Sequence, residues 1–147
     1  MKKLTRFIFI PALVLVIASC SDQKQLEKNL TRQAGRWNID NYKVTIATTD
    51  QPTEVLEYGD SGYMYFFDNG DGQWIDLKDP DETLFVEFEW EITEESKLLI
   101  EYNNEDFIFD FVVNEKDRQV IRNEEVVQLS ETVFVTTTIE YELLRIE

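Results

Sequence analysis

The sequence predicts an all-β domain, and two observations carry this prediction. From Arg36 onward, apolar and polar residues alternate with a period of two, which is typical of strands that bury one face. Turn residues interrupt the alternation at intervals of about 8–12 residues, as in an antiparallel meander that folds as a sandwich or closes into a barrel. Closure into a barrel is favoured because it leaves no sheet edge exposed.

The first nineteen residues are organised like a bacterial signal peptide. Three basic residues precede an apolar stretch, residues 7–18, which is shorter than the roughly 20 residues that a membrane-spanning helix needs. The sequence Ile17-Ala18-Ser19-Cys20 then resembles the lipobox of bacterial lipoproteins. The resemblance implies cleavage before Cys20 and a diacylglycerol anchor on its sulfur, which binds a membrane stably because it carries two acyl chains. The alternative is a plain secretory signal or a short anchor with an incidental cysteine.

The segment that follows Cys20 is polar, apart from three residues spaced by four: Leu26, Leu30 and Ala34. This spacing places them along one side of a helix. Gly35 ends the predicted helix, since glycine readily adopts the left-handed conformation found after a last helical turn. We interpret residues 20–34 as a lipidated tether with a short helix that separates the lipid from the domain.

The predicted strands follow one another through short connections. The clearest strand covers residues 83–93, with apolar residues on one face and three glutamates on the other. Asn69-Gly70, between two alternating segments, is a strong indication of a hairpin turn. A change of phase at Asp40-Asn41 predicts a β-bulge. The nine or ten expected strands cover residues 37–46, 53–58, 62–68, 73–78, 83–93, 97–102, 107–113, 120–122, 126–129 and 132–146.

The charge of the chain limits its partners. The full sequence has 30 acidic and 14 basic residues, and the first nineteen residues hold three of the basic ones, which leaves a formal charge of −19 after cleavage. Nucleic acid is excluded as a partner, because phosphate binding needs a basic surface. Such acidity favours solubility and also steers basic partners. Glu87, Glu89 and Glu91 lie on one side of a predicted strand. This side is either a solvated outer face or a docking strip for a basic protein.

Residues at the start of the first predicted strand resemble a known family. Gly35-Arg36-Trp37 resembles the Gly-x-Trp signature of lipocalins. With the signal peptide, the hairpin after Tyr-Phe-Phe-Asp-Asn-Gly (residues 65–70) and the Glu-Trp-Glu-Ile strand (residues 89–92), it makes residues 30–147 similar to lipocalin-like lipoproteins of Bacteroidota. The resemblance implies an antiparallel up-and-down barrel of about eight strands. It also implies that Trp37 plugs the closed end and that an arginine, best matched by Arg145, covers the indole ring. The alternatives are an ordinary core tryptophan and an exposed charge at a strand end.

Aromatic residues on the predicted inner face decide whether the barrel has a cavity. They line a pocket for a small apolar ligand or they fill the interior, because a barrel of eight strands is just wide enough for its own side chains or one small ligand. These residues are Phe88, Trp90, Phe107, Phe109, Phe111 and Tyr141.

The sequence offers no catalytic constellation. It contains no histidine and a single cysteine, which excludes nucleophile–histidine hydrolysis and the usual zinc sites. Residues 68–72 carry oxygen ligands around glycines, but an EF-hand would need a glutamate where Asp79 stands, and a hairpin turn explains these residues. A mechanism that uses only carboxylates, as in glycosidases, remains formally possible. Asp106 and Asp110 are two acids on the same side of a predicted strand, and we interpret them as part of a solvated face. We therefore expect no enzyme, no cofactor and no metal.

The expected organisation is a signal peptide (residues 1–19), a lipidated tether with a short helix (20–34) and a lipocalin-like barrel (35–147). We expect a lipid-anchored protein of the cell envelope. In some bacteria of this group an acidic run directly after the cysteine directs lipoproteins to the cell surface, but Ser21-Asp22-Gln23-Lys24 holds a single acid. The default location is therefore the periplasmic face of the outer membrane. The barrel then binds a small apolar ligand. The alternative is an acidic interaction protein with a filled barrel, either a subunit of an envelope assembly or an inhibitor of a basic enzyme.

Overall fold

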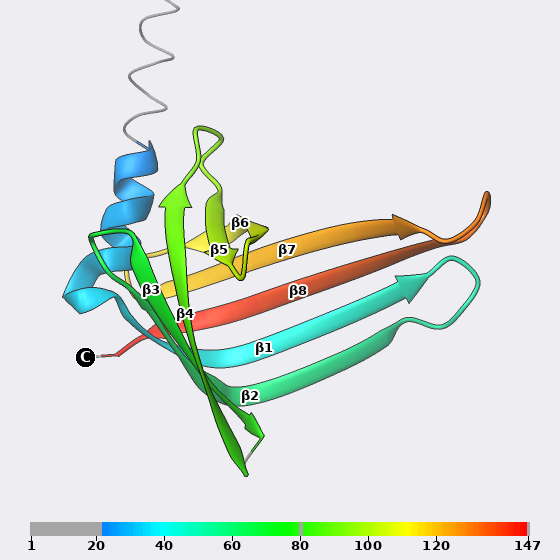
Figure 1. Ribbon diagram of the computed structural model, residues 1–147, viewed down its shortest axis with the longest axis horizontal. Helices are drawn as coiled ribbons and strands as arrows, with labels where there is room; N and C mark the ends of the chain where they lie inside the picture. The colour runs from blue at the N-terminus through cyan, green and yellow to red at the C-terminus, as the bar shows by residue number, and fades with distance from the viewer. Residues whose placement is uncertain (1–21, 80, 147) are drawn as a thin grey trace, which may run out of the picture.

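The computed structural model describes residues 22–79 and 81–146, which form one closed antiparallel barrel (Figure 1). Each strand pairs with the next along the chain, and the last pairs with the first. The predicted up-and-down barrel of eight strands is therefore confirmed. The strands are β1 (Arg36–Thr48), β2 (Glu54–Phe66), β3 (Asp71–Asp79), β4 (Glu82–Ile92), β5 (Leu98–Tyr102), β6 (Glu105–Asn114), β7 (Arg118–Gln128) and β8 (Phe134–Arg145).

The N-terminal helix covers residues 22–31 and continues into a short 3-10 turn, η1 (Arg32–Gly35). Its apolar residues Leu26 and Leu30 are buried in the same core cluster as the barrel side chains. The predicted short helix is therefore confirmed, and it packs against the domain; that it also separates the lipid from the domain stays a prediction. Ala34 does not join the buried stripe, because it lies in the left-handed region with a φ of 61° and its side chain is exposed.

Two pairs of predicted strands are merged in the structure. Residues 53–58 and 62–68 were expected on either side of a turn, but β2 runs through both, with one extra residue opposite the Asp40 bulge of β1. Asp60 adopts a left-handed conformation with a φ of 45°. The strand bends at this bulge, and its pairing with β1 continues on both sides. In β7, Asn123 donates a hydrogen bond to the Ile108 carbonyl at 2.8 Å, and the strand continues through it.

Two local predictions are confirmed. The register between β1 and β8 shifts between Ile39 and Asn41, which is the bulge expected at Asp40-Asn41. The β2–β3 connection is a tight turn in which Gly70 donates to the Phe67 carbonyl at 3.2 Å and has a φ of 88°. Only glycine adopts this φ without strain.

The barrel is closed along one part of its length and open at one end. β2 pairs with β1 along most of its length but with β3 only from Gly62 to Phe66. Beyond this point β1, β2, β7 and β8 continue as a four-stranded extension, which Figure 1 shows pointing away from the helix. We call this extension the long arm (residues 42–48, 54–58, 123–128 and 134–141). The tip of the β3–β4 hairpin diverges from it as the short arm (residues 74–79 and 82–86; Figure 1).

Candidate functional site

Trp37 lies at the end of the barrel that the helix covers. Its side chain is fully buried, and its indole nitrogen donates a hydrogen bond to the Leu30 carbonyl at 3.0 Å. The Arg145 guanidinium lies over the indole ring, 3.8 Å from its centroid. Gly35 is needed beside them, since a Cβ at this position would lie 1.8 Å from the Phe66 carbonyl oxygen. The structure thus brings Gly35, Trp37 and Arg145 together at this end; that they serve as the closing motif of a lipocalin stays a prediction.

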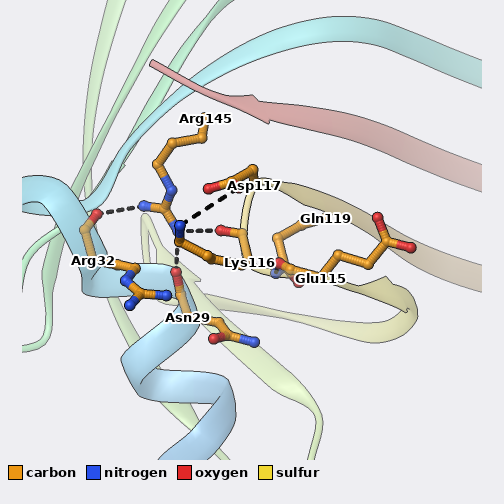
Figure 2. A network of polar contacts seen from close by, with 7 residues as sticks. All are labelled: Asn29, Arg32, Glu115, Lys116, Asp117, Gln119 and Arg145. Carbon is orange, nitrogen blue, oxygen red and sulfur yellow. Dashed lines mark hydrogen bonds and ion pairs between the residues drawn. The ribbon is translucent and has the colours of Figure 1, made fainter. Parts of the chain in front are cut away.

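Arg145 also joins three segments of the chain (Figure 2). Its guanidinium donates hydrogen bonds to the carbonyls of Asn29 and Arg32 in the helical segment and, at 3.0 Å, to that of Lys116 in the β6–β7 turn. Burial lowers the pKa of Arg145 from its ordinary value, because a charge loses hydration when it is buried. The ring contact and the three carbonyls compensate this loss, so Arg145 fastens the helix to the barrel.

The interior next to this end is filled by side chains. Trp37, Phe66, Leu98, Ile121 and Leu143 have less than 2% of their surface exposed. All six aromatic residues considered as ligand-lining belong to this packing: Phe88, Trp90, Phe109 and Tyr141 are buried in the core, and Phe107 and Phe111 pack against it.

One of these core residues, Tyr141, also lies where the packed core meets the open end. Its ring is 4.9 Å from that of Tyr42 and 6.1 Å from that of Trp74, centroid to centroid. The structure thus places Tyr141 in a second aromatic group, which we call the mouth cluster (Tyr42, Tyr58, Trp74, Asp76, Lys78 and Tyr141).

The mouth cluster borders a hollow between the long and short arms. The hollow has a volume of about 440 Å³ and is lined by Tyr42, Val44, Leu56, Tyr58, Lys78 and Asp79. The first four residues are direct cross-strand partners in β1 and β2 and lie on the face that continues the barrel interior. Leu56 is 51% exposed and Tyr58 is 39% exposed. The open end therefore presents an apolar surface that is continuous with the core.

Lys78, which lines this hollow, forms an ion pair with Asp76. The Lys78 ammonium is 2.9 Å from a carboxylate oxygen of Asp76, with 22% and 12% of the two side chains exposed. The same ammonium lies 4.0 Å from the centroid of the Tyr42 ring and 5.0 Å from that of the Trp74 ring. The Trp74 indole nitrogen is buried, and no hydrogen-bond partner for it lies among the described residues. The cluster thus combines ring faces, a carboxylate and a free indole donor.

Burial perturbs the two tyrosines of this group. Burial is the main cause that raises the pKa of Tyr141 above its ordinary value, and the charges of Tyr42 and Asp76 add to it. Burial, followed by the Asp76 charge, also raises the pKa of Tyr42, and a hydrogen bond from Tyr141 partly offsets this. Both hydroxyls therefore stay protonated over the physiological pH range.

A second hollow lies on the outer face of β3 to β6 and is acidic. It has a volume of about 750 Å³, and Glu87 and Glu89 of the predicted docking strip line it. Glu91 lies farther along β4, opposite Leu99, and does not line it. Four acidic residues, one on each of the strands β3 to β6, are direct cross-strand partners of one another. We call them the acidic row: Asp71, Glu89, Glu101 and Asp106. Like charges that face each other directly destabilise a sheet.

Neither a metal site nor a membrane-spanning helix is found in the described part of the chain. No group of three or more Asp, Glu, Cys or His side chains there is arranged to hold a metal ion. Residues 68–72 form the hairpin turn, where the Asn69 amide donates to Asp71 at 2.5 Å. Between residues 22 and 146, residue 80 aside, no helix is long and apolar enough to cross a membrane. The predicted lipidation site, Cys20, lies outside the described residues.

Of the mouth cluster, only Tyr141 was predicted from the sequence, and the other members were missed for a physical reason. Trp74, Asp76 and Lys78 are spaced by two and share one face of β3, whereas the intervening Ile75 and Leu77 are apolar. A polarity pattern therefore favours Ile75 and Leu77 as the inward pair. The signal that points to the site is an acid and a base two residues apart after a tryptophan, in the same strand.

No protein-family model matches this chain, and no curated protein is similar to it. A deswapped triple mutant of bovine odorant-binding protein is similar in structure, with 16% identity, 76% of this chain and 72% of that chain covered, and a TM-score of 0.44. The complex of bovine odorant-binding protein with undecanal has 18% identity, coverage of 80% and 75%, and a TM-score of 0.42. Lobster apocrustacyanin A1 has 10% identity, coverage of 85% and 69%, and a TM-score of 0.43. These neighbours are lipocalins. At these TM-scores the likeness adds no functional argument, and we infer the ligand chemistry from this chain's own residues.

Proposed function

We propose that this protein is a lipid-anchored protein of the bacterial cell envelope that binds a small apolar ligand at the open end of its barrel. The lipid anchor and the envelope location rest on the sequence around Cys20. The site of ligand binding rests on the geometry of the two arms. Because the inner residues of the barrel pack against one another, the ligand lies on the apolar surface between the arms, and the core stays filled.

The observation that carries the ligand proposal is the uncovered apolar face of the long arm. Val44, Leu56 and Tyr58 continue the inner face of the barrel. Because β3 pairs with β2 only from Gly62 to Phe66, Leu56 and Tyr58 remain largely exposed. Ligand pockets commonly have volumes of about 300–1,000 Å³ and combine apolar walls with a few polar groups. The hollow at the mouth, with its Asp76–Lys78 pair, has this character.

The experiment uses two neighbouring residues of β2 as a matched pair. Val55 and Leu56 are both 51% exposed, but only Leu56 lines the mouth hollow. We expect wild-type protein to enhance the fluorescence of the apolar probe N-phenyl-1-naphthylamine. Leu56→Asp should abolish the enhancement, because it puts a charge on the apolar surface, whereas Val55→Asp should leave it unchanged. Equal loss in both variants, or no enhancement by the wild type, would contradict the proposal.

A second candidate function is favoured by the acidic row. Four carboxylates in direct cross-strand contact cost stability, and a basic protein docked over them would relieve the repulsion. This candidate makes the protein an interaction partner, for example an inhibitor of a basic enzyme such as lysozyme.

The test of this candidate measures binding to lysozyme by surface plasmon resonance at increasing salt. Binding through the acidic row should weaken steeply with salt, through slower association. The double variant Glu89→Gln/Glu101→Gln should lose it, while Glu124→Gln/Glu125→Gln on the exposed edge of β7, with the same change in charge, should not. Absence of binding at low salt would reject lysozyme as the partner.

A further inference from the structure

The environment of the Lys78 ammonium has the chemistry of a binding site for cations. The ammonium lies over the faces of Tyr42 and Trp74, at 4.0 and 5.0 Å from their centroids, and 2.9 Å from Asp76. The ring of Tyr141 packs against both aromatic rings, tilted by 37° to Tyr42 and nearly perpendicular, at 82°, to Trp74. We call Tyr42, Trp74, Tyr141 and Asp76 the aromatic box. Ring faces and a carboxylate attract ammonium groups, and aromatic boxes of this kind recognise quaternary ammonium ligands.

The charges around the box favour a cation over an anion. Asp76 lies in the box, 2.9 Å from the Lys78 ammonium, and Asp79, whose carboxylate accepts a hydrogen bond from the Asp81 amide, lines the hollow beside it. The box and the lining of the hollow therefore carry two negative charges and one positive charge. An anionic head group that enters beside Lys78 would meet both carboxylates. If the Lys78 side chain withdraws, the box retains Asp76 and its ring faces, with the apolar residues Val44 and Leu56 next to it.

Lys78 is also placed so that its side chain can leave. Its ion pair with Asp76 is local, since the two residues are neighbours on one face of β3. The pairing between β3 and β4 is irregular between Asp76 and Asp79, the segment that carries Lys78. Withdrawal of the ammonium breaks one contact between distant parts of the chain, its position over the Tyr42 ring, and the ammonium of a bound ligand would take that position. The flexible stem of a lysine reaches solvent readily.

We propose that the mouth site binds amphiphiles that carry an ammonium head group, and that Lys78 occupies the aromatic box of the empty protein in place of that head group. The head group displaces the Lys78 ammonium, while the apolar tail lies along Val44, Leu56 and Tyr58. This inference rests on the proposed function, because it specifies the ligand class of the same site.

The experiment compares three probes with the same alkyl chain by isothermal titration calorimetry, below their micelle concentrations: decyltrimethylammonium, decanol and decanoate. We expect wild-type protein to prefer the cation. Lys78→Ala should bind the cation about tenfold more tightly, which corresponds to about 1.4 kcal/mol, because the internal competitor is gone. Lys43→Ala is the matched control: it removes the same charge from β1, on the opposite face from Tyr42, and should change cation affinity by less than about twofold.

A second variant tests the box directly. Asp76→Asn keeps the size of the side chain and should weaken cation binding about tenfold while decanol binding stays the same; circular dichroism checks that the variant is folded. Preferential decanoate binding that Lys78→Ala abolishes would overturn the inference, since Lys78 would then anchor an anion. Equal binding of all three probes, unaffected by either variant, would overturn it as well. If none of the three probes binds, both this inference and the proposed function fail. In the other two cases only this inference fails.

Discussion

Substitution of Arg145 tests how the closed end of the barrel is held. Arg145→Met keeps most of the apolar stem but removes the charge over Trp37 and the three hydrogen bonds to the carbonyls of Asn29, Arg32 and Lys116. We expect the helix to loosen from the barrel, because no other described side chain joins these three segments in the same way.

The magnitude follows from these contacts. A cation over an indole ring contributes about 1–2 kcal/mol when it is partly buried. Hydrogen bonds to a charged donor are worth about 1.5–3 kcal/mol each when they are intact, but carbonyls at the surface recover water, and burial of the Arg145 charge already costs stability, as its lowered pKa indicates. Together these contributions give a loss of about 3 kcal/mol for Arg145→Met. Arg145→Lys keeps a cation but cannot reach all three carbonyls, so its loss should be about half as large.

The assay is urea unfolding followed by tryptophan fluorescence and far-ultraviolet circular dichroism. A loss of about 3 kcal/mol lowers the urea midpoint by about 1–2 M. Arg122→Met is the matched control, because Arg122 forms an ion pair with Glu140 at 2.6 Å that is exposed on the sheet, and such surface pairs contribute about 0–1 kcal/mol. If Arg145→Met is as stable as Arg122→Met, the stabilising role assigned to Arg145 is refuted.

Three further predictions follow from the structure, and a fourth follows from the sequence around Cys20. Gly35→Ala should unfold the domain or destabilise it by more than about 3 kcal/mol, since the added Cβ would overlap a backbone carbonyl; thermal unfolding measures this. Leu30→Ala should cost about 3 kcal/mol, because the side chain is fully buried, and hydrogen exchange should show the helix opening before the barrel. The raised pKa values of Tyr42 and Tyr141 mean that the stability linked to these groups is present below pH 10.0, the ordinary tyrosine pKa, and is lost as the pH rises above it; ultraviolet titration should show both phenolates forming only above that pH, and Tyr141→Phe should flatten the alkaline loss. Cys20→Ser should abolish incorporation of labelled fatty acid in a bacterial host and release the protein from membranes, whereas persistent labelling would contradict lipidation at Cys20.

The strand pattern could be predicted from the sequence because it depends on local chemistry. The alternation in residues 83–93 and the Asn69-Gly70 turn both depend only on residues that are adjacent in the sequence. The merged strands could not be predicted in the same way. Gly59 to Gly62 has the composition of a turn, and only pairing with β1 keeps this segment within a strand.

The candidate site depends on information that a single strand does not contain. Lys78 reaches the Tyr42 ring only because β3 and β1 lie on either side of β2 in the barrel. The exposure of Leu56 follows from how few residues of β2 pair with β3, which is a matter of register between strands. The aromatic residues of β4 and β6 were candidate ligand contacts by composition, but their packing against one another places them in the core.

The central claim is that the ligand lies at the mouth while the core stays filled. The three tryptophans of the chain test it, because Trp74 belongs to the mouth cluster whereas Trp37 and Trp90 are buried in the core. A bromoalkanol quenches tryptophan fluorescence only at close contact, so titration into wild-type protein should quench part of the emission. Trp74→Phe should show no quenching, while calorimetry shows that it still binds the probe. Quenching that persists in Trp74→Phe would place the ligand against Trp37 or Trp90, inside the barrel, and would contradict the account.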